Sequence, residues 1–430
     1  MAAPPPSTLS RPSAAASATG TTPNYTSALS AVTTLFFLWG FITCLNDILI
    51  PYLKAIFQLS FAQANLINLC FFGAYFLMSI PAGKLVARLG YKRGMLLGFV
   101  VAAIGAFLFY PAAAQRAYGL FLGALFVLAS GITLLQVAAN PYVAILGPPQ
   151  SASSRLTLTQ AFNSLGTTLA PLLGSALILS RLPKLDNATT AASIDISAVQ
   201  LPYLIIGGML LLISFILSRI NLPVIEHTAD DDEVTGSHHE SAWQYRHLIL
   251  GVVGIFAYVG AEVAIGSHIV SYLALPNVAS MDPSQAGKMV SYYWGAAMVG
   301  RFAGAYLLNK FSPTKLLALN AVGAVVLILI SMNSTGAIAM WSLLAVGLMN
   351  SLMYPTIFTL AVAGLGRHTE EGSGLLCTAI VGGALVPLLF GFIADHSGLR
   401  IALLLPVVCY VYVMWYGLRG SRRAATVAVA

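Results

Sequence analysis

The sequence contains few charged residues. Only 8% of its 430 residues are Asp, Glu, Lys or Arg, against roughly 25% in an average soluble domain. Hydrophobic residues make up 58% of the chain, and its mean hydropathy is +0.84. This composition is typical of an integral membrane protein, whose structural unit is a spanning helix of about 20 residues.

Cysteines and enzyme motifs are scarce as well. The four cysteines all lie in apolar stretches, and none has a neighbour at a metal-ligand spacing, so neither a disulfide framework nor a zinc site is indicated. The chain has no His-Glu-x-x-His pattern and no serine elbow in a strand-turn-helix context. We therefore expect neither an enzyme nor a protein with a resident cofactor or metal.

Apolar segments long enough to cross a bilayer recur along the chain, and the most polar stretch separates six of them from six others. The twelve segments lie at about 30–53, 61–84, 93–112, 117–146, 154–181, 199–219, 246–275, 286–309, 314–332, 337–364, 372–395 and 399–418. The sequence therefore predicts an all-α integral membrane protein with twelve transmembrane helices in two six-helix halves.

The polar stretches set the expected domain boundaries. Six-helix bundles are predicted over 29–220 and 245–420, joined by a cytoplasmic linker over 221–244 that carries an acidic run. The residues before and after the bundles, 1–28 and 421–430, are predicted to be cytoplasmic tails. The first tail is rich in Pro, Ala, Ser and Thr and lacks the apolar core of a signal peptide, so we expect it to be disordered and uncleaved.

The net charge of +7 is explained by membrane topology. Most of the 21 lysines and arginines fall on the side that carries both termini, which predicts cytoplasmic termini by the positive-inside rule. Nucleic-acid binding then has no support. The expected partners are the lipid bilayer and a small-molecule substrate, and we expect a monomer.

The two halves resemble each other in sequence. Gly166 aligns with Gly382, and Asn140-Pro141 has its counterpart in Tyr354-Pro355. The matches keep their order at offsets of about 214–220 residues, which indicates parallel repeats of six helices. Such repeats place a binding site near the midplane, at the interface between the halves.

Only two acidic residues, Asp47 and Glu262, lie at membrane depth. A carboxylate there costs about 2.5–3.5 kcal/mol on insertion scales, so it normally marks a pathway or a proton site. Glu262 could accept a hydrogen bond from a substrate, act as a second ionisable site, or pair with a cation near a helix end. His268 is nearby, and a packing role and a functional role both stay open for it.

Amide side chains occur in pairs on two helices. Gln136 and Asn140 are four residues apart, and Gln160 and Asn163 are three apart, so each pair shares a helix face. Each amide offers a donor and an acceptor and can bridge vicinal hydroxyl groups, although hydrogen bonds between helices use the same residues. We predict a polar-substrate site. Further candidates for substrate contact are Asn46, Asn350 and the aromatic residues Trp39, Trp294 and Tyr354.

A glycine-bounded turn with four cations follows the second segment. Its candidate conformational residues are Gly83, Arg88, Gly90, Lys92 and Arg93. The spacing resembles the signature loop of the major facilitator superfamily, which has an acidic residue where Ala87 stands, so the usual charge pairing of that loop is not carried over. A plain positive-inside loop is the alternative. Arg301, between two packing glycines, is expected to be structural.

Three longer motifs carry a closer resemblance. The stretches Trp39–Asp47, Gln136–Tyr142 and Gln160–Gly166 are similar to the fucose:proton symporter family within that superfamily. The resemblance is greatest to its bacterial glucose/galactose transporter branch, notably at Thr43–Asp47 and Gly260–Val263.

The resemblance implies uptake of a hexose across a bacterial inner membrane by alternating access, coupled to inward proton movement. Asp47 matches the carboxylate that the family protonates. The family's second carboxylate, a glutamate, is replaced here by Gln136, so Asp47 acts alone or shares the role with Glu262. Sodium coupling, uncoupled transport, another monosaccharide such as fucose, and a drug or organic-ion transporter of the same fold remain alternatives.

Overall fold

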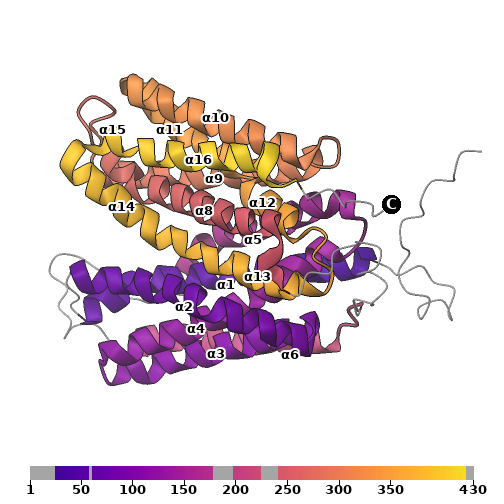
Figure 1. The fold of residues 1–430 in the computed structure, drawn as a ribbon. Coiled ribbons are helices and arrows are strands. Elements are labelled where there is room, and N and C mark those ends of the chain that lie inside the picture. The colour runs from indigo at the N-terminus through magenta and orange to yellow at the C-terminus, as the bar shows by residue number, and fades with distance from the viewer. Residues whose placement is uncertain (1–24, 58–60, 178–196, 224–240, 423–430) are drawn as a thin grey trace, which may run out of the picture.

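The structure is a computed structural model that describes residues 25–57, 61–177, 197–223 and 241–422, and its regular elements there are helices (Figure 1). The N-terminal half consists of α1 (Tyr25–Phe57), α2 (Phe61–Leu89), α3 (Tyr91–Ala114), α4 (Tyr118–Ile145), α5 (Ala152–Leu177) and α6 (Ser197–Arg219).

The C-terminal half begins with three continuous helices and ends with three interrupted ones. The continuous helices are α8 (Arg246–Leu273), α9 (Pro283–Leu307) and α10 (Pro313–Asn333). The interrupted ones are α11 (Gly336–Asn350) with α12 (Met353–Val362), α13 (Thr369–Thr378) with a 3₁₀ turn and α14 (Gly382–Ser397), and α15 (Leu399–Ala402) with α16 (Leu404–Trp415) and a π-helical turn. The predicted fold class, twelve helices in two halves, is confirmed.

Two prolines at equivalent positions of the halves shape the helices around the centre of the molecule. A proline inside a helix removes the hydrogen bond to the carbonyl group four residues earlier. Pro355 thereby frees the carbonyl of Ser351, where α11 ends and α12 begins, and Pro141 inside α4 frees the carbonyl of Val137. Both freed carbonyl groups accept hydrogen bonds from side chains, as described below.

Among the described residues, ten helical stretches are long and apolar enough to cross a membrane. The more polar α5 and α9 are not among these ten, and they pack against each other between the halves. Their polarity is therefore directed at the interface between the bundles.

Some predicted boundaries differ from the helices observed. Helix α1 begins at Tyr25, so residues 25–28 of the predicted tail are helical, and residues 242–244 of the predicted linker form a 3₁₀ turn. The rest of the tails and most of the linker (1–24, 224–240 and 423–430) lie outside the described residues.

The internal repeat is visible in how the helices approach each other. Gly166 of α5 lies so close to the carbonyl of Phe37 in α1 that a Cβ atom would overlap it. Gly382, at the start of α14, meets the carbonyl of Phe256 in α8 in the same way. The first helix of each half thus packs on its fifth through an equivalent glycine, and these two glycines are the pair that aligns in the sequence repeat.

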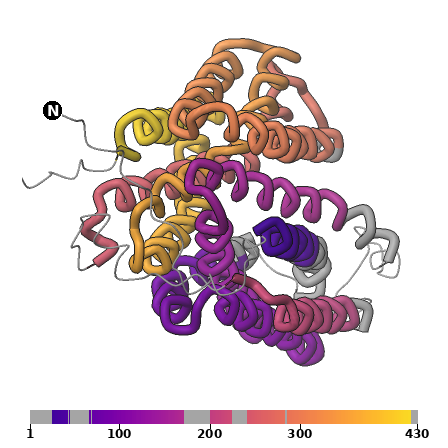
Figure 2. The backbone as a smooth tube through the Cα atoms, turned by 90° about the vertical axis from the view of Figure 1, so that its right-hand side faces the viewer, coloured from indigo at the N-terminus to yellow at the C-terminus, as the bar shows by residue number. Residues whose placement is uncertain are grey.

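The two halves lie one above the other in Figure 1, and Figure 2 shows both from one end. They touch where α2, α4 and α5 meet α9, α12 and α13. The Ser153 and Thr359 hydroxyl groups are 2.6 Å apart, Ser154 donates to the carbonyl of Ala305 (2.6 Å), and the Ser373 hydroxyl donates to the Val137 carbonyl freed by Pro141 (2.9 Å). These contacts gather at the end of the molecule where α2 ends and α5 begins, which we call the closed end.

Candidate functional site

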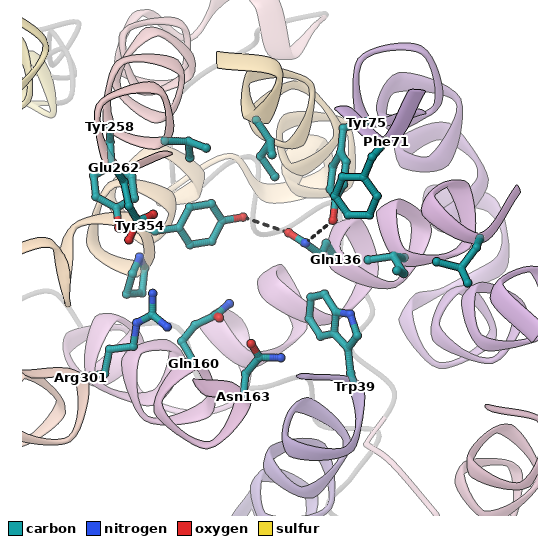
Figure 3. Close-up of a pocket in the computed structure, with 15 residues that line it drawn as sticks. Trp39, Phe71, Tyr75, Gln136, Gln160, Asn163, Tyr258, Glu262, Arg301 and Tyr354 are labelled. Carbon is teal, nitrogen blue, oxygen red and sulfur yellow. Dashed lines mark hydrogen bonds between the residues drawn. The ribbon is translucent and has the colours of Figure 1, made fainter. Parts of the chain in front are cut away.

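A cavity of about 290 Å³ lies between the two halves. Helices α1, α2, α4 and α5 line it from one side, and α8, α9, α12 and the turn after α13 line it from the other. Its polar and aromatic lining residues are Trp39, Phe71, Tyr75, Gln136, Gln160, Asn163, Tyr258, Glu262, Arg301 and Tyr354 (Figure 3).

Close contact between α1 and α5 positions two of these residues. Gly40 lies against the backbone and side chain of Asn163, where any larger residue would overlap them. The Asn163 amide donates to the carbonyl of Phe36 (2.9 Å), and the ring of Phe36 meets that of Trp39 edge to face at 5.4 Å. The amide and the indole are therefore held on adjacent parts of one wall.

A chain of hydrogen bonds crosses the cavity between the halves (Figure 3). Tyr354 donates from its hydroxyl to Gln136 Oε1 (3.4 Å), and Gln136 Nε2 donates to the Tyr75 hydroxyl (2.6 Å). Asn140 Nδ2 donates to the same Tyr354 hydroxyl (3.1 Å) and Gln160 Nε2 donates to Asn140 Oδ1 (3.5 Å). Asn140 and Tyr354, which align in the sequence repeat, thus meet directly, and Asn140 lies buried behind the wall.

Glu262 brings a carboxyl group to the wall formed by α8. The residue is only 8% exposed, and its Oε1 has no hydrogen-bond partner among the described residues. Its surroundings include Tyr258, one turn earlier on α8, and the charge of Arg301 on α9 (Figure 3). Because an unpaired buried acceptor is costly, this oxygen is suited to accept a hydrogen bond from a hydroxyl group of a ligand.

The sequence predicts a structural role for Arg301, and the structure also places this residue in the lining of the cavity. Its guanidinium donates through Nη1 to the Ser164 hydroxyl on α5, in the opposite half, and through Nε to the Ser351 carbonyl freed by Pro355 (3.4 Å). Arg301 therefore connects the halves beside the candidate site.

Trp294 and His268 lie away from the cavity. Trp294 is 43% exposed, and its ring meets Tyr293 edge to face. His268 bonds the carbonyl of its own helix at Ala264 (2.8 Å) and packs on Phe390, with ring centroids 4.5 Å apart. These contacts are those of packing residues.

Asn350, also outside the cavity, is a buried hub of the C-terminal half. Its amide donates to the Tyr293 hydroxyl and accepts from the Tyr410 hydroxyl, both at 2.7 Å. Asn350→Leu leaves two buried hydroxyl groups without this partner, so we expect about 2–4 kcal/mol of destabilisation. Thermal unfolding in detergent measures it. The exposed Asn309 is the matched control, and a Tm of Asn350→Leu equal to that of Asn309→Leu would contradict the hub role.

The placement of the remaining candidates is mixed. Asn46 and Asp47 belong to α1, but their side chains lie outside the described residues. Gly83 is buried at the closed end against the backbone of α13, and Lys92 donates to the Ser218 carbonyl (3.0 Å) at the end of α6. In the same loop, Gly90 has the left-handed φ of 79° that the turn into α3 requires, and Arg88 and Arg93 are exposed.

Sequence reasoning did not single out Tyr75 and Tyr258 as cavity residues. Tyr258 precedes Glu262 by one helical turn, so the shared face was a usable signal. Tyr75 lies in an apolar run that also contains Phe71, and nothing local separates its hydroxyl from those of packing tyrosines. Among the described residues, no group of three or more His, Cys, Asp and Glu side chains could hold a metal ion.

Comparisons with known proteins agree with this geometry. The model of the Major Facilitator Superfamily matches residues 28–379. A glucose/galactose transporter of Brucella abortus is 55% identical over 93% of this chain and 95% of its own length. The L-fucose-proton symporter of Escherichia coli is 35% identical over 94% of this chain and 95% of its own. The crystal structure of the transporter FucP in the outward conformation superposes with a TM-score of 0.85 at 34% identity, covering 93% of this chain and 99% of that one.

Proposed function

The chain belongs to the major facilitator superfamily, and from this premise we propose that it is a secondary active transporter that takes up a hexose, glucose or galactose, together with protons. It is a multi-pass membrane protein and a transporter, not an enzyme. The proposed location is a bacterial inner membrane, with both termini in the cytoplasm.

The observation that carries the proposal is the chemistry of the cavity. Gln136, Gln160 and Asn163 offer amide donors and acceptors from one half. From the other half, Glu262 offers an acceptor that has no partner within the described segments. Vicinal hydroxyl groups match such a set because each hydroxyl both donates and accepts. Trp39 provides an aromatic face for the apolar side of a sugar ring. The 55% identity to a glucose/galactose transporter supports this choice of substrate.

Alternating access fits the way the halves meet. Hydrogen bonds of Ser153, Ser154 and Ser373 join the halves at the closed end, which also carries the loop between α2 and α3 with its cations. By the positive-inside rule this end faces the cytoplasm, so we propose that the cavity in this conformation serves the outer side. Opening the closed end would then release the sugar inside.

Coupling is assigned to Asp47, with Glu262 as a second ionisable candidate. In the N-terminal half, Asp47 is the one acidic residue that the sequence places at membrane depth. Gln136 cannot carry a proton, so ion movement through this half must use Asp47. In the proposed cycle, Asp47 takes up a proton from the outer side, sugar binds, the halves rock, and release inside restores the carboxylate.

The decisive test is uptake into proteoliposomes with glucose, galactose, fucose and mannose, under separate proton and sodium gradients. We expect concentrative uptake of glucose or galactose that needs the proton gradient and collapses with an uncoupler. Accumulation driven by sodium alone would reassign the ion. Equilibration without accumulation under either gradient would make the protein a facilitator, and a panel with no sugar transported would refute the proposal.

Gln136→Leu tests whether an amide of the N-terminal half binds the sugar. The substitution removes a donor and an acceptor for sugar hydroxyl groups and leaves Tyr75 and Tyr354 without their shared partner. Because each lost hydrogen bond contributes about 0.5–1.5 kcal/mol, we expect the KM for sugar exchange to rise about tenfold. Gln200→Leu is the control, since Gln200 on α6 bonds the Tyr110 carbonyl away from the cavity. Equal KM values for the two variants would remove Gln136 from the site.

A further inference from the structure

We propose that Arg301 is a latch with two positions: it binds Ser164 of the opposite half while the closed end is shut, and it turns to Glu262 of its own half when that end opens. The inference deepens the proposed function, on which it rests for the alternation between two conformations. In this proposal Arg301, beside the cavity, controls the contact between the halves.

Local structure places the guanidinium between its two partners. Gly300 lets α9 approach the junction of α11 and α12 so closely that a Cβ atom would overlap the Ser351 side chain. Pro355 has freed the Ser351 carbonyl, which accepts from Arg301 Nε (3.4 Å). This bond lies within the C-terminal half, so it can persist in both conformations and act as the pivot of the latch.

Ser164 is oriented to receive the guanidinium. Its hydroxyl donates to the carbonyl of Gln160 one turn earlier on α5 (2.9 Å). A hydroxyl has one proton and two lone pairs, so with the proton used inside α5 the lone pairs remain for Arg301 Nη1. Ser164 is buried, and the bond joins the two halves beside the substrate cavity.

Glu262 is the second partner proposed for Arg301. Its Oε1 is buried and has no hydrogen-bond partner among the described residues, although the positive charge of Arg301 acts on this carboxyl group. In Figure 3 the guanidinium lies on the same side of the cavity as the carboxyl group. Both bonds have a charged donor, but a carboxylate can accept two parallel N–H bonds from a guanidinium, so the contacts that close the halves keep Arg301 on Ser164 in this conformation.

The exchange of partners has a clear energetic consequence. Separating the halves at the closed end breaks the bond to Ser164, which leaves Nη1 of the half-buried Arg301 without that acceptor and is unfavourable. Pairing with Glu262 offsets that loss within one half. The latch thereby lowers the barrier to opening.

The test uses Cys377 as a reporter of the closed end. This residue is fully buried in α13, one turn after Ser373, whose hydroxyl bonds Val137 in the other half. In a background carrying Cys44→Ser, Cys70→Ser and Cys409→Ser, the rate of alkylation by N-ethylmaleimide measures how often the end opens. Labelling is followed on the full chain in proteoliposomes, without sugar or ion gradients and at constant pH.

Two substitutions that introduce uncharged side chains are expected to change the labelling rate in opposite directions. Ser164→Ala removes the present partner of Arg301 and should raise the labelling rate about fivefold, whereas Glu262→Gln weakens the alternative partner and should lower it about fivefold. Thr159→Val is the control on α5, because the Thr159 hydroxyl bonds the Leu156 carbonyl of its own helix (2.9 Å), and it should leave the rate unchanged. General loosening of the protein cannot produce the slower rate.

A double-mutant cycle completes the test. In an Arg301→Gln background neither Ser164→Ala nor Glu262→Gln should change the labelling rate. Unchanged rates in the single variants, changes in the same direction, or effects that persist without Arg301 would each overturn the latch. The labelling contains no sugar, so its result can be interpreted even if the substrate panel shows no transport. If the panel shows sugar transport and the labelling rates are unaffected, the latch is refuted while the proposed function stands.

Discussion

Replacing Asp47 with asparagine is expected to abolish concentrative uptake while sugar exchange across the membrane continues. Asparagine keeps the size of the side chain and its capacity to bind sugar hydroxyl groups, but it cannot take up or release a proton. Since the sequence places no other acidic residue at membrane depth in the N-terminal half, no neighbouring group in that half can substitute for it. Accumulation should fall to the external concentration, and counterflow should remain.

The measurement compares uptake driven by a proton gradient with gradient-free counterflow in the same proteoliposomes. Asp395→Asn is the matched control, because Asp395 is an exposed residue near the end of α14. Concentrative uptake that survives in Asp47→Asn would refute the coupling role. Loss of counterflow together with accumulation would instead make Asp47 a sugar contact.

Gly166→Val and Gly382→Val should each prevent the chain from forming a stable protein. A side chain at either position would overlap a backbone carbonyl of the first helix of its half, at Phe37 or Phe256. Backbone cannot move aside as a flexible side chain can, so the cost exceeds the about 1–3 kcal/mol of ordinary overpacking. We expect little or no monodisperse protein after detergent extraction.

Gly208→Val is the control for these substitutions. Gly208 lies in α6, and a Cβ atom there would meet nothing within 4 Å. It carries the same valine in a helix, so any cost from helix propensity appears in the control too. If Gly166→Val and Gly382→Val yield folded protein with the Tm of Gly208→Val, the close approach of the first and fifth helices is not required in either half.

Much of this architecture could be predicted because it depends on local patterns. The length of each apolar run decides that it spans the bilayer, since backbone polar groups in lipid must be satisfied within the helix. The alignment of Gly166 with Gly382 indicated two parallel halves, although it did not say which helix each glycine packs against. The spacing of the amides placed Gln160 and Asn163 on one face of α5, and both line the cavity.

The same patterns were less informative for residues whose role depends on a distant partner. Asn350 and Tyr354 are both polar residues of one segment, yet Tyr354 reaches the cavity and Asn350 is enclosed by Tyr293 and Tyr410. Spacing along the chain gives the angle of a side chain about its helix axis. It does not say which helix lies opposite.

The sequence by itself therefore determined the number of helices and their division into two repeated halves, because hydrophobic length and periodicity act within a single helix. Only the tertiary structure decided which side chains meet across the halves. The bond from Arg301 to Ser164 joins α9 to α5, and Glu262 on α8 keeps a buried oxygen that has no hydrogen-bond partner in the described part of the chain. Such contacts depend on how the two bundles are rotated against each other, and no local stretch of sequence records that rotation.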